Sequence, residues 1–233
     1  RAGVGTALLS PVAFPADGGY INIKTAYGAK GDGVTDDTAA ILRAIRENIE
    51  ERDHVIYFPD GVYLVSDTLI WKNSMGQWRA YLAFQGQSQA GTIIKLKNNA
   101  TGYSDPANPR AVIFTASNQT SSNTSNGQGD EAYRNNIQNL TVDTGSGNPG
   151  AIGIDYLANN QGRIDSVEIR SGDGRGRIGL AMTRPYMGPG LIKNVTVSGF
   201  DYGISVKITH SSATLEGITL KNQRVAGLMT EDN

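Results

Sequence analysis

Asp155, Lys207 and Glu231 are the residues whose types and positions best suit acid–base chemistry in this chain. Carboxyl and amino groups are common general acids and bases when a fold holds them near a reacting bond. Each of the three lies in a short segment where apolar and other residues alternate, so we expect their side chains to point outward from a strand. The alternative is that they are solvated charges on an exposed sheet face, where most charged residues lie.

The segments around these residues predict a shallow trough on one sheet face. The apolar residues expected to point inward are Ile152, Ile154, Ile178, Leu180, Ile204, Val206 and Leu228. Strand alternation then places small residues outward, namely Gly153, Gly179, Ala181 and Ser205. Arg184, Tyr186 and Asp201 fall in the adjoining turns, where we expect them to add contacts to a ligand.

A glycine-rich segment, residues 171–177, carries Arg175 and Arg177. Two guanidinium groups can bind a carboxylate or a phosphate through paired hydrogen bonds. The segment lacks the strand-to-helix context of a phosphate-binding loop, so a tight turn between strands is the other interpretation. His54 and His210 are the only histidines and there is no cysteine, so the sequence predicts no metal site.

A repeated template must position these residues. Four segments carry apolar residues at their first, fourth and sixth positions, and they begin at Ile137, Ile164, Ile192 and Leu215. Strand-bearing repeats of roughly 20–30 residues are typical of solenoids, in which each coil buries its apolar face against its neighbours. The sequence therefore predicts an all-β solenoid of parallel strands. Asn139 and Asn194 share the third template position and are interpreted as turn residues.

The N-terminal part predicts a helix that covers one end of the solenoid. Residues 1–20 are expected to form an extended lead-in, and residues 21–233 one β-helix domain that begins with a short strand at residues 21–23. The helix is expected over about 37–50, with one apolar face made by Ile41, Leu42, Ile45 and Ile49. Asp36 and Asp37 precede it, and adjacent carboxylates at a helix start fit capping better than sugar hydrolysis, which needs them apart.

Composition limits the classes of partner. The formal net charge is −1, which gives no electrostatic case for binding nucleic acid or inserting into an anionic membrane. Hydrophobic residues make up 39% of the chain, but no apolar run approaches the roughly 20 residues that a membrane-spanning helix needs. The first nine residues are too short and too weakly apolar to be an intact signal peptide.

Two stretches near the N-terminus resemble a known superfamily. Tyr27-Gly-Ala-Lys-Gly-Asp-Gly-Val-Thr-Asp-Asp-Thr-Ala-Ala-Ile41 is followed by Val55-Ile-Tyr-Phe-Pro-Asp-Gly-Val-Tyr-Leu64. With the repeats downstream, they resemble the N-terminal signature of the pectate-lyase-like superfamily, which includes polygalacturonase-related proteins, exo-β-1,3-glucanase-like glycoside hydrolases and phage tailspikes. The resemblance implies a right-handed, single-stranded parallel β-helix with an N-terminal capping helix.

The resemblance also implies a function. The leading hypothesis is a glycoside hydrolase of an extracellular or cell-wall polysaccharide, with this chain supplying entry coils and part of the groove and needing no cofactor. The candidate catalytic residues are Asp155, Glu231 and Lys207, and the candidate substrate-binding residues are Arg184, Tyr186, Asp201 and Arg175. In the polygalacturonase-related proteins that the chain resembles, three aspartates carry out the hydrolysis together with a Gly-His-Gly and an Arg-Ile-Lys element. Neither element occurs in this sequence.

Two other hypotheses stay open. One is a non-catalytic structural or adhesive β-helix, such as a spike or surface filament subunit. The other is a lyase or epimerase of an acidic polysaccharide, favoured by Arg175, Arg177 and Lys207, and only this hypothesis would call for Ca²⁺. The sequence ends soon after Leu228 without a polar cap, so we expect the N-terminal part of a longer extracellular or cell-surface solenoid, whose last coil can self-associate.

Overall fold

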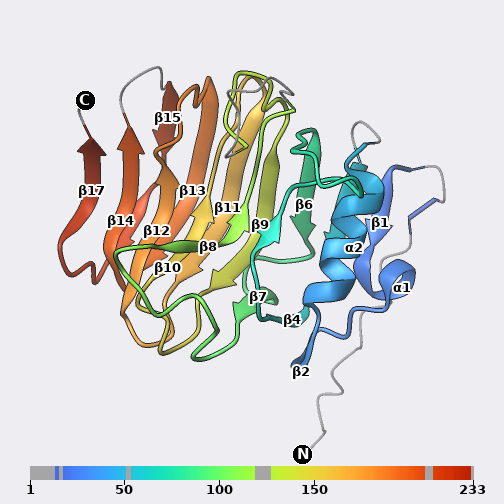
Figure 1. The fold of residues 1–233 in the computed structure, drawn as a ribbon, viewed down its shortest axis with the longest axis horizontal. Coiled ribbons are helices and arrows are strands. Elements are labelled where there is room, and N and C mark those ends of the chain that lie inside the picture. Colours follow the sequence, from blue (N-terminus) through green and yellow to red (C-terminus); the bar gives the residue numbers. More distant parts are fainter. Residues whose placement is uncertain (1–13, 16–17, 51–53, 119–126, 208–211, 232–233) are drawn as a thin grey trace, which may run out of the picture.

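The chain forms a parallel β-helix that one helix covers at its N-terminal end (Figure 1). A computed structural model describes residues 14–15, 18–50, 54–118, 127–207 and 212–231. The coils follow one another along the long axis, from helix α2 (Thr38–Asn48) at one end to strand β17 (Ala226–Glu231) at the other. The predicted β-helix is therefore confirmed. The predicted lead-in at residues 1–20 lies mostly outside the described residues.

The strands form two sheets, and every pairing between named strands of the described residues is parallel. The first sheet contains β1 (Tyr20–Asn22), β2 (Asp32–Asp36), β3 (His54–Phe58), β4 (Gly61–Val65), β6 (Leu82–Gly86), β7 (Thr92–Leu96), β9 (Asn136–Asp143), β11 (Gly162–Arg170), β13 (Gly190–Ser198), β15 (Ala213–Glu216) and β16 (Thr219–Lys221). The second contains β5 (Leu69–Ile70), β8 (Arg110–Phe114), β10 (Ala151–Asp155), β12 (Gly176–Met182), β14 (Phe200–Lys207) and β17.

The repeated template corresponds to one column of the first sheet. Ile137 pairs with Ile164, Ile164 with Ile192, and Ile192 with Leu215. The three isoleucines of this column are fully buried, and Leu215 in the last coil is partly exposed. The same column continues toward the N-terminus through Phe84, so the predicted ladder is confirmed and extended.

The third template position is a bend in each of the four template segments. Asn139, Ser166, Asn194 and Gly217 all adopt left-handed backbone conformations, with φ between 52° and 63°. Asparagine and glycine tolerate this conformation, because an Asn side chain can bond locally and glycine has no Cβ. The Asn139 amide also donates to the carbonyl of Gln87, at 2.9 Å. The interpretation of Asn139 and Asn194 as turn residues is confirmed.

Helix α2 is shorter than predicted by about a turn in total, and it closes the end of the core. Ile41 and Ile45 are fully buried, whereas Leu42 is only partly buried against the core. Asp36 accepts a hydrogen bond from the Thr38 amide at 3.0 Å, and Asp37 accepts bonds from two amides of the preceding glycine-rich loop. Asp36 therefore caps the first turn as predicted, whereas Asp37 makes no side-chain bond to the helix and holds the preceding loop instead.

A one-turn helix replaces part of the strand predicted at residues 21–23. Strand β1 ends at Asn22, and helix α1 (Ile23–Tyr27) begins directly after it. The Asn22 side chain accepts hydrogen bonds from the amides of Lys24 and Thr25, at 3.0 and 3.4 Å, which caps the first turn. Gly28 then ends the helix with a left-handed φ of 76°.

The predicted orientation of two glycines in the second sheet is wrong. A Cβ on Gly153 would lie 2.3 Å from Ile169, and one on Gly179 would lie 2.1 Å from Val197. Ile169 and Val197 belong to the main core, so these glycines face the interior rather than a trough. Glycine is required because the coils approach each other too closely for a side chain.

The strand alternation shifts by one residue at this point. Gly153 and the fully buried Ile154 are consecutive, yet both face the core. Ile152 and Ile178 therefore lie on the outer face, contrary to prediction, in a separate apolar cluster with Ala111, Phe114 and Ala181. Because of the same shift, Asp155 points outward as predicted.

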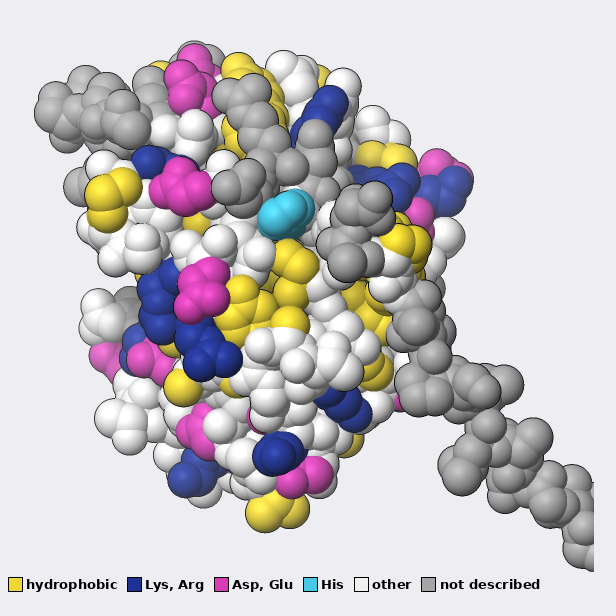
Figure 2. Space-filling model, turned by 90° about the vertical axis from the view of Figure 1, so that its right-hand side faces the viewer, with side chains coloured by type: hydrophobic (Ala, Val, Ile, Leu, Met, Phe, Trp, Pro, Cys, Tyr) yellow, Lys and Arg dark blue, Asp and Glu magenta, His cyan; other side chains and the backbone are white. Residues whose placement is uncertain are grey.

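Charged groups on the capped end of the molecule are mixed in sign. Figure 2 shows Lys and Arg side chains next to Asp and Glu side chains, with apolar patches between them. This distribution agrees with the near-neutral net charge of the whole chain. Within the described residues, no helix is long and apolar enough to span a membrane.

Candidate functional site

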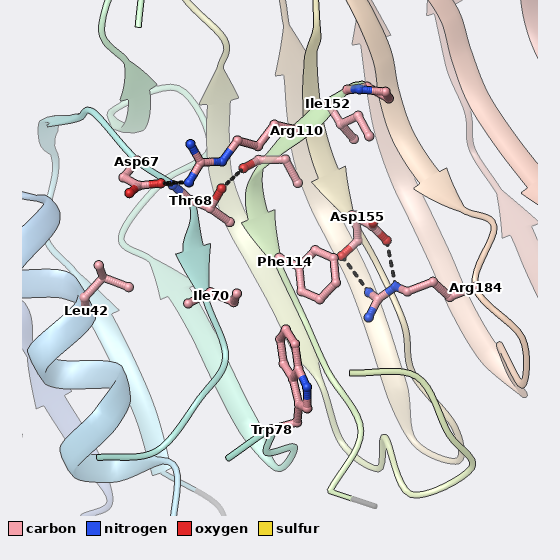
Figure 3. A pocket seen from close by; sticks show the side chains of 12 residues that line it. Leu42, Asp67, Thr68, Ile70, Trp78, Arg110, Phe114, Ile152, Asp155 and Arg184 are labelled. Carbon is pink, nitrogen blue, oxygen red and sulfur yellow. Dashed lines mark hydrogen bonds and ion pairs between the residues drawn. The ribbon is translucent and has the colours of Figure 1, made fainter. Parts of the chain in front are cut away.

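A groove of about 560 Å³ opens on the outer face of the second sheet, beside the capping helix. Its walls come from helix α2, strands β5, β8 and β10, and the connections that precede and follow them (Figure 3). The lining residues are Leu42, Asp67, Thr68, Ile70, Trp78, Pro109, Arg110, Ala111, Phe114, Ile152, Asp155 and Arg184. Such a mostly apolar concave surface with a few polar groups is typical of ligand sites.

Asp155 and Arg184 form an ion pair on one wall of this groove. Arg184 Nε lies 2.9 Å from Asp155 Oδ1, and Arg184 also donates to the Asp155 carbonyl at 3.1 Å. The guanidinium is nearly buried and stacks on Phe114, with its Cζ 4.0 Å from the ring centroid. Burial lowers the pKa of Arg184, and the Asp155 carboxylate opposes that effect, so the guanidinium stays charged.

Asp67 and Arg110 form a second ion pair on the opposite wall (Figure 3). The guanidinium of Arg110 also lies over the ring of Tyr103, 5.2 Å from its centroid. Asp67 accepts a hydrogen bond from the Thr68 amide, at 2.5 Å. This pair is about half exposed, unlike the Asp155–Arg184 pair, so its charges are more accessible to a ligand.

Trp78 and Phe114 supply the aromatic surface of the groove, with Phe114 between the two ion pairs and Trp78 below it in Figure 3. Their ring centroids are 5.5 Å apart, and the ring planes are tilted by 38°. The ammonium group of Lys72 lies 4.0 Å from the Trp78 centroid and covers one face of the indole. The groove thus combines two aromatic rings with two carboxylates and two guanidinium groups.

Of the predicted site residues, only Asp155 and Arg184 line the groove. Lys207 is the strand neighbour of Glu231 in the register of β14 and β17, at the far end of the second sheet. The Glu231 side chain lies outside the described residues. Tyr186 is half exposed and contributes its carbonyl to a bond from the Asn159 side chain. Neither Lys207 nor Tyr186 lines the groove.

Two more predicted residues have structural surroundings. Asp201 lies on strand β14, not in a turn, and its carboxylate is nearly buried between Arg177, at 3.0 Å, and Arg224. The amide of Arg175 donates to Ser171 Oγ and to Asp173 Oδ1, both at 3.1 Å, within the glycine-rich segment. These bonds favour the interpretation of residues 171–177 as a tight turn.

Trp78, Phe114, Asp67 and Arg110 were missed by the sequence prediction. One signal was present for Phe114, because Val112-Ile-Phe114 is the preceding coil of the second sheet. Ile113 pairs with Ile154, and Phe114 pairs with Asp155. Extending the second ladder back by one coil places an aromatic ring beside Asp155. Trp78 lies in a connection without periodicity, and nothing in its sequence context indicates the groove.

Metal-binding groups are not clustered in the described part of the chain. No set of three or more His, Asp or Glu side chains there has a geometry that could hold an ion. The Ca²⁺ ion that the lyase hypothesis calls for would need several carboxylates together. In the groove, Asp67 and Asp155 lie on opposite walls, each paired with an arginine, so these residues do not fit such a site.

Comparison with known proteins assigns the chain to a family, and this family agrees with the β-helix fold. Residues 20–233 match the family described as rhamnogalacturonase A/epimerase, pectate lyase-like. The chain belongs to this family. The resemblance noted in the N-terminal stretches is therefore confirmed over nearly the whole chain.

Curated relatives match shorter regions of this family member. A glucan 1,3-beta-glucosidase of Cochliobolus carbonum is 29% identical over 133 residues, which are 57% of this chain and 14% of that protein. The non-secreted LysM effector LysM19 of Penicillium expansum is 49% identical over 49 residues, 21% of this chain and 4% of that protein. The chain thus spans a small part of the length of these relatives.

Solved structures share the fold at low sequence identity. ORF18 of Geobacillus virus E2 is 17% identical with a TM-score of 0.57, over 87% of this chain and 42% of that one. The A-module of the mannuronan C-5 epimerase AlgE6 of Azotobacter vinelandii is 18% identical with a TM-score of 0.55, over 89% of this chain and 57% of that one. At this identity the likeness concerns the fold alone.

Proposed function

We propose that this chain forms the saccharide-binding coils of a carbohydrate-active β-helix protein, and that the groove beside helix α2 holds the sugar. The observation that carries the proposal is the pairing of Trp78 and Phe114 with two ion-paired carboxylates in one concave site. A sugar ring has apolar C–H faces and a rim of hydroxyls. Aromatic rings can cover the faces, while carboxylates and guanidinium groups bond the rim.

A glycoside hydrolase of an extracellular or cell-surface polysaccharide is the finer form of the proposal. The glucan 1,3-beta-glucosidase relative supports it, as do the two carboxylates, Asp67 and Asp155, that line one groove. Glycosidases use two carboxyl groups on either side of the scissile bond, one of which must donate a proton. In this form, Asp155 and Asp67 are that pair, and the arginines orient them.

A binding role without turnover is the second candidate, and one observation favours it. Both carboxylates are engaged by guanidinium groups, an arrangement suited to accepting hydrogen bonds from hydroxyls rather than to donating a proton. The lyase or epimerase hypothesis is supported by the family description, which names an epimerase, but not by the groove. Its expected cations lie outside the groove, because Arg177 is bonded to Asp201 and Lys207 belongs to the far end of the sheet.

Calorimetric titration with a soluble β-1,3-glucan oligosaccharide and with a rhamnogalacturonan oligosaccharide tests the proposal. We expect one of them to bind, and W78A to weaken binding about tenfold or more, as loss of an aromatic contact does. M75A is the matched control, because Met75 is exposed on the same connection but does not line the groove. Equal binding by wild type and W78A would contradict the groove as the site.

A reducing-sugar assay on the same glycans separates the hydrolase from the binding role. Turnover that is lost in D67N, and in D155N at a temperature where circular dichroism shows that this destabilised variant is still folded, supports the hydrolase. Binding without turnover supports the second candidate. D165N is the control, because Asp165 lies on strand β11 of the other sheet. Turnover that survives both groove substitutions would show that these carboxylates are not the catalytic pair.

A further inference from the structure

Trp78 reaches the groove on a short connection whose tip is exposed to solvent. Residues 72–79, here called the 72–79 hairpin, fold back on themselves through an antiparallel bridge between Lys72 and Trp78. The Asn73 amide donates to the Gln77 carbonyl at 2.9 Å, and Gly76 closes the turn with a φ of 74°. The hairpin tip is exposed, with Met75 at 71%. An exposed hairpin this short is only marginally stable on its own, so something must hold it.

Glu50, which follows helix α2 and does not line the groove, is bonded to the hairpin at two points. Its carboxylate accepts a hydrogen bond from the side-chain amide of Asn73, which is almost completely buried. It also accepts the Nε–H of Arg79, at 3.1 and 3.3 Å to the two oxygens. Charge-assisted bonds of this kind are the stronger class of hydrogen bond.

The two partners of Glu50 lie on either side of Trp78 along the chain and organise the rest of the hairpin. The Asn73 side chain accepts hydrogen bonds from the amides of Met75 and Gln77, at 3.1 and 2.9 Å. Arg79 donates to the Trp78 carbonyl at 2.9 Å. The position of the Trp78 backbone thus depends on Asn73 and Arg79, and one carboxylate directly after the capping helix holds both.

We propose that Glu50 is a positioning residue that holds Trp78 in the wall of the groove through Asn73 and Arg79. The capping helix then has two roles, because it covers the end of the core and also sets one wall of the ligand site. Leu42 of the same helix lines the groove directly, so helix and hairpin face the ligand together. The proposal rests on the proposed function only for its ligand-binding arm.

Tryptophan fluorescence tests the positioning without any ligand. The chain has two tryptophans, and Trp71 is fully buried, so acrylamide quenching reports on Trp78. We expect E50A to raise the quenching constant about twofold or more and E50Q to raise it less, because glutamine keeps an oxygen for Asn73. E47Q is the matched control, since Glu47 lies in the last turn of helix α2, three residues before Glu50, and interacts with Tyr27 instead.

Saccharide binding supplies the second arm. With the glycan that binds wild type, we expect E50A to weaken affinity by roughly tenfold, the size of losing one charge-assisted hydrogen bond, and E47Q to leave it unchanged. R79Q should weaken affinity about as much as E50Q does. The double variant should bind no more weakly than either single variant, because both substitutions break the same Glu50–Arg79 interaction. Melting curves of each variant show that the coils remain folded.

The two arms fail separately. If E50A leaves both quenching and affinity at wild-type values while W78A weakens binding, the groove stands and the positioning role is wrong. If E50A raises quenching but W78A binds as wild type does, Glu50 positions the hairpin and the proposed ligand site is wrong. A quenching change in E47Q equal to that in E50A would show a nonspecific charge effect and overturn the proposal.

Discussion

Arg184 Nε lies 2.9 Å from Asp155 Oδ1, although 29 residues separate them in the sequence. Strand β10 supplies the carboxylate, and the turn after strand β12 supplies the guanidinium, so the pair ties two neighbouring coils together at the groove. Both side chains are largely buried, at 16% and 9% exposure. Their contact is therefore part of the fold as well as part of the site.

Breaking this pair should destabilise the protein strongly. D155N leaves a nearly buried guanidinium without its counter-charge, which typically costs about 3–5 kcal/mol in the free energy of unfolding. Urea unfolding followed by circular dichroism measures the change. The control is K193Q, because the Lys193–Glu216 pair is exposed and should contribute less than about 1 kcal/mol. Equal effects of the two substitutions would contradict the burial assigned to Arg184.

The glycine column of the second sheet makes a second prediction. G179A places a Cβ 2.1 Å from Val197 and 2.8 Å from the Gly203 carbonyl, so we expect a loss of about 1–3 kcal/mol in the free energy of unfolding. Gly227, in the last described coil, is the matched control, since its Cβ would meet only Leu220, at 3.2 Å. Equal melting temperatures of G179A and G227A would contradict the close approach of the Val197 side chain to Gly179.

The bend at the third template position predicts a stabilising substitution. Ser166 holds a φ of 56°, where the other coils place asparagine or glycine. S166G removes a backbone strain of about 1 kcal/mol and loses one partly buried bond to the neighbouring Asp165, so we expect a higher melting temperature. S198G, in an extended strand of the same sheet, should lower it by a similar amount. A lower melting temperature for S166G would contradict the left-handed conformation.

Glu50 gives a pH-dependent prediction. The hydrogen bond from Asn73 and the charge of Arg79 lower the pKa of Glu50 below its ordinary value of 4.5. A lowered pKa means that the stabilisation is fully present above pH 4.5 and is lost as the pH falls through the folded-state pKa. Acrylamide quenching of Trp78 should therefore rise below pH 4.5 in the wild type. E50Q should lack this component, and identical pH profiles would contradict the link.

The strands of the first sheet could be predicted from the sequence because their apolar residues repeat at fixed positions. Ile137, Ile164 and Ile192 repeat in a fixed template, and each coil buries the same positions against the next. A solenoid needs only neighbour contacts, so local periodicity carries the topology. Asn139 and Asn194 could be assigned for the same reason, since both recur at one place in the repeat.

The second sheet and the groove were less predictable for physical reasons. Strand alternation has a period of two, and one shift at Gly153 moves every preceding residue to the other face. Ile152 was thus assigned inward, although it belongs to the outer cluster. Asp155 and Arg184 were found by composition and position. Trp78 depends on bonds between Glu50, Asn73 and Arg79, which no periodic pattern encodes.

A crystal structure of the chain with a bound oligosaccharide shows directly whether the groove beside helix α2 holds the sugar. The glycan is the one selected by titration, and the density of its sugar ring can be located without reference to activity. We predict the ring in the groove, in contact with Trp78 and Phe114 and hydrogen-bonded to Asp155 or Asp67. A sugar ring bound elsewhere, such as beside Arg177 and Asp201 or on the first sheet, with the groove empty, would show that the groove is not the saccharide site.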